Sequence, residues 1–220
     1  MDSGNSYFRQ RLERRTELPP EFQNDDVRYP ETLVERLLER YTQPGNVVLD
    51  PFAGFGTTLV VAEELGRSAY GVEYDEGRAR FIRSRVQHPE RLIHGDSRRL
   101  AELALPPVDF SLTSPPFMHR DDPEDPFTAY SQPGQGYASY LATIRSIYAQ
   151  VRALLRPGGR AVLEVANLRD GRGVTTLAWD IAAAVGRELT FEGEIVVLWD
   201  RDPGFGYDHS YCLVFRRPAA

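Results

Sequence analysis

The stretch NVVLDPFAGFGTT, from Asn46 to Thr58, decides the fold of this 220-residue chain. It runs from a short apolar segment, typical of a buried strand, into Asp50, a Gly54-x-Gly56 turn and two threonines that open a helix. Glycine lets the backbone pass close to a bound ligand, and the first turn of a helix favours an anion. Because such a turn is also a common structural connection, its role depends on the residues around it.

Strand and helix patterns alternate on both sides of this stretch. Apolar residues recur at helical spacing in Glu31–Tyr41 and Glu76–Val86, and Ala69–Tyr74 is typical of a strand. Two final strand patterns, Glu194–Trp199 and Ser210–Phe215, have no helix between them and should pair antiparallel. The order predicts an α/β fold with a doubly wound, mostly parallel seven-stranded sheet, an antiparallel strand at the C-terminal end, and ligands at the carboxyl ends of the strands. Further strands are predicted at 46–49, 91–94, 108–113 and 160–165, and helices at 57–65, 138–155 and 175–185.

Length and composition predict one domain, because a chain of this size with 41% hydrophobic residues can bury one substantial core. We expect a polar N-terminal extension over residues 1–25 and a single domain over 26–220, with a lid or recognition loop at 118–137. No apolar run approaches the roughly 20 residues of a membrane helix, and the first residues lack the apolar stretch of a signal peptide, so we expect a cytoplasmic protein. The single cysteine excludes an internal disulfide, and the four histidines lack paired ligand spacing, so we expect no metal site.

The net charge of −6 is unfavourable for a protein that binds nucleic acid, since contacts with phosphate normally supply most of the sequence-independent affinity. Some arginines are clustered nevertheless. Such clusters contact phosphate in some proteins and form solvated helix faces in others, and the sequence leaves both interpretations open. The clustered residues are Arg9, Arg11, Arg14 and Arg15 near the N-terminus, and Arg98 and Arg99 further on.

Two acids follow predicted strands beyond the glycine turn. Glu73 ends the second strand about 20 residues past that turn, where a dinucleotide-type fold grips ribose. A lone acid at a strand end is more often solvated, but the spacing here favours a ribose contact. Asp96 follows the third strand, where an acid also suits the N-cap of a helix.

The stretch from Asn46 to Thr58 resembles the first S-adenosylmethionine (SAM) binding motif of amino-methyltransferases, Asp-Pro-Phe-x-Gly-x-Gly-Thr-Thr. The resemblance implies that Asp50 receives the methionine ammonium and that Phe52 packs beside the sulfonium. It also implies that the methionine carboxylate is surrounded by Gly54, Gly56, Thr57 and Thr58.

Other stretches extend this resemblance along the chain. Asp96 with Ser97 is similar to a later element of the family, whose acid accepts a hydrogen bond from the adenine amine. The run Tyr29-Pro30-Glu31-Thr32-Leu33 resembles the preceding cofactor element and implies cofactor contacts for Tyr29, Pro30 and Thr32, although the Lys or His often found there is missing. Residues 155–159 and 209–215 also resemble parts of this fold family.

The segment Thr113-Ser114-Pro115-Pro116-Phe117, at the end of the fourth predicted strand, separates this chain from other SAM enzymes. Alone it would usually be a stiff loop. It resembles the motif (Ser, Asp or Asn)-Pro-Pro-(Tyr, Phe or Trp) of enzymes that methylate exocyclic nitrogens of adenine, cytosine or guanine. The lone pair of such an amine is delocalised, so acceptors at its two hydrogens help it to pyramidalise and attack. Ser114 Oγ and the Pro115 carbonyl are the candidate acceptors. Pro115 and Pro116 stiffen the turn, and Phe117 offers a stacking face.

These motifs predict a SAM-dependent methyltransferase that acts on an exocyclic amino nitrogen of a nucleobase in DNA, either cytosine N4, which serine in the motif favours, or adenine N6. Methylation of cytosine carbon 5 is excluded, because it needs a nucleophilic cysteine, usually beside a proline, and Cys212 lies in a strand pattern. The loop at 118–137 is acidic, which disfavours phosphate there. RNA and a small-molecule amine therefore stay open as substrates, as does a SAM-binding module without activity.

Overall fold

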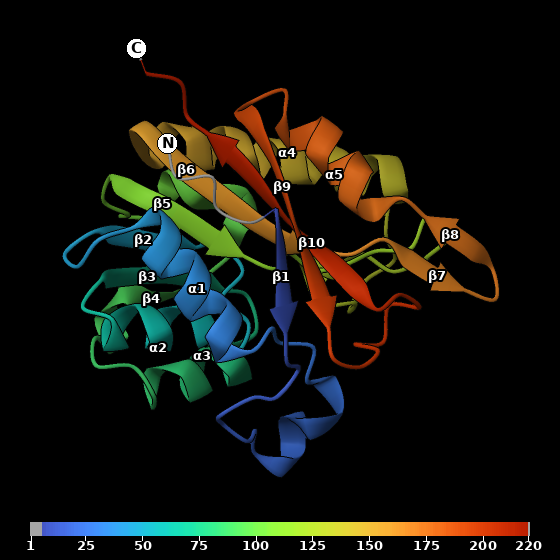
Figure 1. The fold of residues 1–220 in the computed structure, drawn as a ribbon, viewed down its shortest axis with the longest axis horizontal. Helices are drawn as coiled ribbons and strands as arrows, with labels where there is room; N and C mark the ends of the chain where they lie inside the picture. The colour runs from blue at the N-terminus through green and yellow to red at the C-terminus, as the bar shows by residue number, and fades with distance from the viewer. Residues whose placement is uncertain (1–5, 220) are drawn as a thin grey trace.

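The computed structural model describes residues 6–219, so residues 1–5 of the predicted extension lie outside the described part. One mixed sheet forms its centre (Figure 1). Its strands lie in the order β1 (Tyr7–Gln10), β9 (Thr190–Trp199), β10 (His209–Arg216), β6 (Leu155–Val165), β5 (Val108–Thr113), β2 (Val47–Asp50), β3 (Ser68–Glu73) and β4 (Leu92–His94). Neighbouring strands are parallel except at β10, which runs antiparallel to both β9 and β6.

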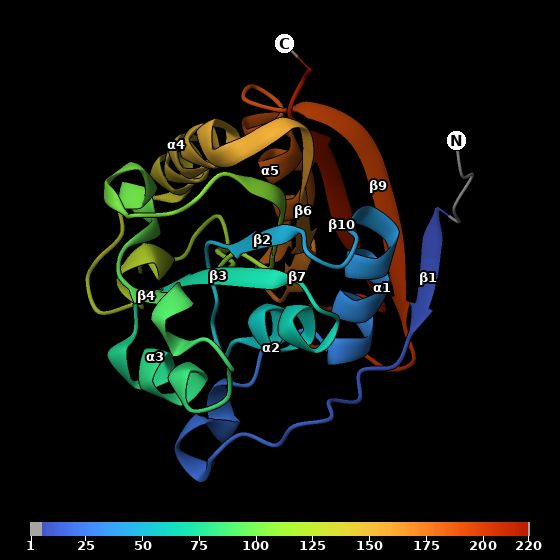
Figure 2. The same ribbon diagram turned by 90° about the vertical axis from the view of Figure 1, so that its left-hand side faces the viewer.

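Helices cover both faces of this sheet, as Figure 2 shows: α1 to α3 lie on one side, and α4 and α5 on the other. The α-helices are α1 (Glu31–Tyr41), α2 (Thr57–Glu64), α3 (Glu76–Arg83), α4 (Tyr137–Leu154) and α5 (Leu177–Val185). Short 3₁₀ helices are η1 (Pro20–Asp25), η2 (Pro89–Arg91), η3 (Ser97–Glu102) and η4 (Pro126–Thr128), and β7 (Leu168–Asp170) pairs with β8 (Gly173–Thr175) in a separate hairpin. None of the helices in residues 6–219 is long and apolar enough to cross a membrane.

The predicted elements are present, and most of their ends differ from the expectation by a few residues. The helix α1 has the predicted bounds, because Leu33, Val34, Leu37 and Leu38 form a single buried face. The strand β5 also has the predicted bounds. The helix expected from residue 175 begins at Leu177, since Thr175 belongs to the hairpin strand β8.

The sheet has eight strands within the described residues, and the expected number of seven was wrong. The additional strand, β1, comes from the stretch expected to be a polar extension, and it pairs in parallel with β9. Only Phe8 and Gln10 of its four residues are buried, so the strand carries too short an apolar pattern to be recognised in the sequence.

The glycine turn after β2 packs closely against helix α3. Gly56 has a φ of 81°, a conformation that side chains disfavour, and a Cβ at this position would lie 2.8 Å from Ile82 Cγ2 of α3. Glycine is therefore required both by the backbone and by the packing. The fold brings Asp50, Glu73 and Thr113, the last residues of β2, β3 and β5, to one edge of the sheet.

Candidate active site

A cavity of about 610 Å³ opens at the carboxyl ends of β2, β3 and β5. Its volume lies in the range of roughly 300–1,000 Å³ that is usual for sites of small ligands. Most of the residues expected to bind the cofactor or to act in catalysis line it: Tyr29, Asp50, Phe52, Gly54, Thr57, Glu73, Asp96, Ser97, Ser114, Pro115, Pro116 and Phe117. Segments that are far apart in the sequence therefore meet in one space.

Asp50 is a buried carboxylate at the floor of this cavity, with 2% of its surface exposed. Its Oδ1 accepts hydrogen bonds from Thr113 Oγ1 at 2.6 Å and from the Phe52 amide at 3.0 Å, and its Oδ2 accepts one from the Tyr29 hydroxyl at 3.4 Å. Burial raises the pKa of Asp50, and these hydrogen bonds oppose the rise. A cationic group beside Asp50 would relieve the cost of burying its charge.

Glu73 holds the turn that follows β2. Its Oε2 accepts a hydrogen bond from the Gly54 amide and its Oε1 one from the Asp75 amide, each at 2.8 Å. Burial raises the pKa of Glu73, and the two amide bonds lower it. Each carboxylate oxygen can accept a further bond from a ligand in the cavity, because each has two lone pairs.

Asp96 and Ser97 border the cavity beyond β4. The Asp96 carboxylate caps η3 by accepting a hydrogen bond from the Arg98 amide at 2.9 Å, as expected for an N-cap. It also forms an ion pair of 2.6 Å with the Arg98 side chain. Ser97 is buried and donates to the Pro51 carbonyl oxygen. The ion pair leaves Asp96 less able to accept from a ligand than an unpaired acid would be.

The segment from Ser114 to Phe117 also lines the cavity, and two tyrosines hold its backbone. The Tyr140 hydroxyl donates to the Pro116 carbonyl at 2.9 Å, and the Tyr130 hydroxyl donates to the Phe117 carbonyl at 3.0 Å. The Pro115 carbonyl accepts no hydrogen bond from the described residues. It therefore keeps its acceptor capacity for a ligand.

Four expected cofactor residues do not line the cavity: Pro30, Thr32, Gly56 and Thr58. Thr32 is exposed and accepts from Gln10 Nε2 at 2.6 Å, which ties α1 to β1. Thr58 is buried behind Tyr29 and hydrogen-bonded to its hydroxyl. Gly56 lies against Ile82, and its role is to allow this close packing.

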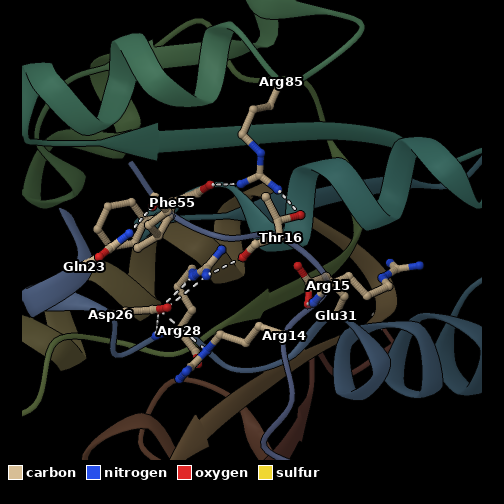
Figure 3. Close-up of polar contacts among 10 residues, drawn as sticks. Arg14, Arg15, Thr16, Gln23, Asp26, Arg28, Glu31, Phe55 and Arg85 are labelled. Carbon is tan, nitrogen blue, oxygen red and sulfur yellow. Dashed lines mark hydrogen bonds and ion pairs between the residues drawn. The ribbon is translucent and has the colours of Figure 1, made fainter. Parts of the chain in front are cut away.

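Arg28 is a cavity residue that no motif in the sequence singles out. It is 8% exposed and donates from Nε and Nη2 to Asp26 and from Nη2 to the Thr16 carbonyl at 2.9 Å (Figure 3). Its Nη1 is buried with no partner among the described residues. The only sequence signal was its position beside Tyr29-Pro30, in an element where the expected cation was missing. A buried guanidinium nitrogen at the cavity wall suits an anionic group.

Aromatic side chains from distant segments complete the wall. Phe127 of η4 lies 6.0 Å from Phe52, and Phe205 lies 5.4 Å from Phe117, both measured between ring centroids. Tyr130 and Ala129 of the loop at 118–137 also line the cavity. The described residues contain no group of three or more His, Cys, Asp or Glu side chains that could hold a metal ion.

Residues 7–84 match the model of a protein family described as DNA methylase. The Type II methyltransferase M.BglII of Bacillus subtilis is 47% identical over 50 residues, which are 23% of this chain and 14% of that protein. The DNA adenine methyltransferase YhdJ of Escherichia coli is 33% identical over 86 residues, which are 39% of this chain and 28% of that protein. The matches thus span less than a third of either relative.

Among solved structures, a TehB-like SAM-dependent methyltransferase from Corynebacterium glutamicum superposes with a TM-score of 0.56 at 19% identity. The superposition covers 83% of this chain and 85% of that one. At this identity the likeness establishes the fold. The chain has the α/β fold of this class, and the fold-class expectation is confirmed.

Proposed function

We propose that this chain, whose residues 7–84 match the DNA methylase family, is a methyltransferase that uses SAM to methylate an exocyclic amino nitrogen of a base in DNA. One observation carries the proposal. Asp50 and Glu73 line the same cavity as the segment from Ser114 to Phe117. A donor bound at the two acids would therefore lie beside an amine bound at that segment.

The residues at the glycine turn fit SAM. Asp50 offers a buried carboxylate whose raised pKa an ammonium would lower, and Arg28 offers an unpartnered nitrogen for a carboxylate. Glu73 offers acceptors for the two ribose hydroxyls. We assign these three residues to the ammonium, the carboxylate and the ribose, with Phe52 beside the sulfonium and Asp96 and Ser97 near the adenine.

The segment from Ser114 to Phe117 would receive the base. SAM, when bound, supplies an activated methyl group. Ser114 Oγ and the Pro115 carbonyl would accept from the two amine hydrogens, which localises the nitrogen lone pair and prepares it for attack. Phe117, packed against Phe205, would stack on the base and keep its plane in line with the amine.

DNA is the substrate that we favour over RNA or a small amine, because the matching family model and YhdJ carry DNA in their descriptions. The target base must leave the duplex to reach the cavity, at a cost of a few kcal/mol that backbone contacts must offset. Either cytosine N4 or adenine N6 suits the acceptors of the site. In the domain proposed over 26–220, to whose sheet residues 7–10 add the strand β1, we assign the loop at 118–137 to lid or recognition contacts. Four residues of this loop line the cavity: Pro126, Phe127, Ala129 and Tyr130.

The arginines clustered in the sequence are poorly placed to contact phosphate, because most already form internal pairs. Arg15 pairs with Glu35 and Glu64, and Arg98 and Arg99 pair with Asp96 and Glu102. Arg14 donates to the Arg28 carbonyl oxygen. Their pairing reduces the positive charge that is available to DNA.

Two other arginines are better candidates for phosphate contact, because each lies beside the loop that carries the cavity residue Phe205. The Arg169 amide donates to the carbonyl of the cavity residue Phe205 at 3.0 Å, and its guanidinium stacks on Tyr207. Arg201 precedes the same loop and is exposed. Arg169 is exposed as well, so both guanidinium groups can reach a phosphate. We assign both to the phosphates that flank the target base.

The test is transfer of tritiated methyl groups from SAM to duplex DNA, single-stranded DNA, RNA and free bases, followed by separation of the product nucleosides. We expect label in N4-methylcytosine or N6-methyladenine from DNA. Ser114→Ala should abolish most of it without loss of SAM affinity, and exposed Ser84→Ala is the matched control. Label only on RNA or a free amine would reject DNA, and no label on any amine would reject the enzyme.

The phosphate assignment has its own measurement. Changing Arg169 and Arg201 to Gln should weaken binding of DNA and reduce the slope of log affinity against log salt by about 0.7 to 0.9 for each lost contact. Arg99→Gln, which removes an arginine already paired with Glu102, should leave the slope unchanged. An unchanged slope in the double variant would reject this surface.

A further inference from the structure

Glu164 is a buried carboxylate directly behind the proposed catalytic segment. It lies in β6, and 3% of its surface is exposed. In the register of the sheet Leu163 pairs with Thr113, so Glu164 is the neighbour of Ser114 across the strands, and on its other side it pairs with Cys212. Glu164 does not line the cavity. A charge is costly in such a place unless a role retains it.

The hydroxyl groups of Ser114 and Ser210 lie beside the Glu164 carboxylate and stabilise its charge. Glu164 Oε1 is buried without a hydrogen-bond partner among the described residues, so it is free to accept from a hydroxyl group. Trp199 Nε1, which can only donate, donates to Ser210 Oγ at 3.1 Å. The Ser210 hydroxyl hydrogen is therefore left for Glu164, and the second hydroxyl on this carboxylate is that of Ser114. An ionised carboxylate can only accept, so a hydrogen bond between Glu164 and Ser114 requires the serine hydrogen to point toward Glu164.

We propose that Glu164 is a positioning residue that draws the Ser114 hydroxyl hydrogen away from the cavity, so that Ser114 Oγ meets the incoming amine with its lone pairs. The inference rests on the proposed function. A free serine hydroxyl can donate as well as accept, and only the accepting orientation helps an amine to localise its lone pair. Glu164 thus turns an ambivalent group into an acceptor, which selects a donor such as an amino group as substrate.

The charge of Glu164 decides this orientation. When protonated, its carboxyl can donate to Ser114, and the serine hydrogen would then point into the cavity and oppose the amine. Burial raises the pKa of Glu164, against the bonds from the two serines. The titratable groups that face it are Tyr29 and Cys212, whose own pKa values burial raises well above their usual ranges, so both are neutral at neutral pH. Asp50, on the far side of Tyr29, is the remaining acid nearby.

The first test is Glu164→Gln, which keeps the volume and replaces an acceptor by a group that also donates. We expect a loss in kcat of roughly 10- to 100-fold, as for outer partners of functional groups. SAM affinity by calorimetry should be unchanged, since the residue does not touch the cofactor cavity. The matched control is Glu192→Gln. Glu192 lies on β9, and its carboxylate is paired with Arg160 and Arg216.

The decisive test is a double-mutant cycle with Ser114→Ala. If Glu164 acts through Ser114, Glu164→Gln should lower kcat in the wild-type background and have no further effect once Ser114 is Ala. A multiplicative loss in the double variant would overturn the inference, and so would full activity of Glu164→Gln. An unchanged melting temperature of each variant separates these results from misfolding.

A second measurement needs no variant at position 164. In the wild type, kcat should fall as the pH drops through the raised pKa of Glu164, and a kcat that stays constant across the acid range would overturn the inference. Folded Glu164→Gln should no longer show this fall in kcat at acid pH. Because the variant still contains Asp50, the loss would assign the pH dependence to Glu164. If the wild-type protein transfers methyl to no amine, both the proposed function and the inference that rests on it are rejected. If wild type is active and Ser114→Ala is impaired, a failed cycle rejects the role of Glu164 alone.

Discussion

The Tyr130 hydroxyl group donates a hydrogen bond of 3.0 Å to the carbonyl oxygen of Phe117, and this bond joins the loop at 118–137 to the proposed catalytic segment. Tyr130 is 49% exposed and adopts a left-handed φ of 58°, next to Ala129 with a φ of 50°. Non-glycine residues adopt this region at a cost, so the loop keeps a particular shape over the cavity.

We predict that Tyr130→Phe weakens the hold of the loop on the base without affecting the cofactor. A neutral hydrogen bond contributes about 1 kcal/mol, so the apparent KM for DNA should rise by about fivefold. Steady-state kinetics with DNA, and calorimetry with SAM, measure the two effects. An equal loss of SAM affinity would show that the loop belongs to the cofactor site.

Arg28→Gln should weaken binding of SAM by about 10- to 100-fold, the loss expected when a charged hydrogen bond to the methionine carboxylate is removed. Binding of methylthioadenosine, which lacks that carboxylate, should hardly change. The ratio of the two affinities by calorimetry is the measurement, because general loosening of the fold would affect both ligands. Arg85→Gln is the control, since Arg85 donates to Phe55 and Thr16 and does not line the cavity.

SAM affinity should rise with pH through the range in which Asp50 ionises. Burial raises the pKa of Asp50, so in the unliganded protein its contribution to stability is present below the unfolded pKa and is lost as the pH rises through the folded pKa. An ammonium beside Asp50 offsets that loss. The increase in melting temperature caused by SAM should therefore be larger at neutral than at acid pH, and Asp50→Asn should reduce this difference. Equal pH dependence for methylthioadenosine would reject the ammonium contact.

Gly56→Ala should destabilise the protein by more than Gly158→Ala. Both glycines have a positive φ, 81° and 79°, so the backbone cost is shared. A Cβ at 56 meets Ile82, whereas one at 158 meets nothing within 4 Å. Denaturant unfolding of the two variants should therefore differ by about 1 to 3 kcal/mol in the free energy of unfolding. This difference measures the steric cost of overpacking at position 56. In an Ile82→Ala background, which lacks the contacting Cγ1 and Cγ2, the difference should shrink, and equal losses at both glycines would contradict this account.

The sequence predicted those parts of the fold that depend on local patterns. The buried face of α1 and the apolar residues of β5 repeat at the spacing of a helix and a strand, so their bounds could be read directly. β1 could not be recognised, because with Phe8 as its buried apolar residue it becomes a strand only through its pairing with β9. The strands of the hairpin of β7 and β8 are shorter still, at three residues each.

At the candidate site, the sequence by itself determined which chemical groups are present and that several of them end their strands, so the motifs alone were enough to select Asp50, Glu73 and Ser114. Tertiary structure alone decided which of the selected residues face the cavity. It turned Thr58 into a buried partner of Tyr29, gave most clustered arginines internal partners, and set Arg28 and Glu164 beside the site. The physical reason is that periodicity and spacing record the contacts of a residue with its own element, whereas burial and hydrogen-bond partners depend on strands and loops distant in the chain.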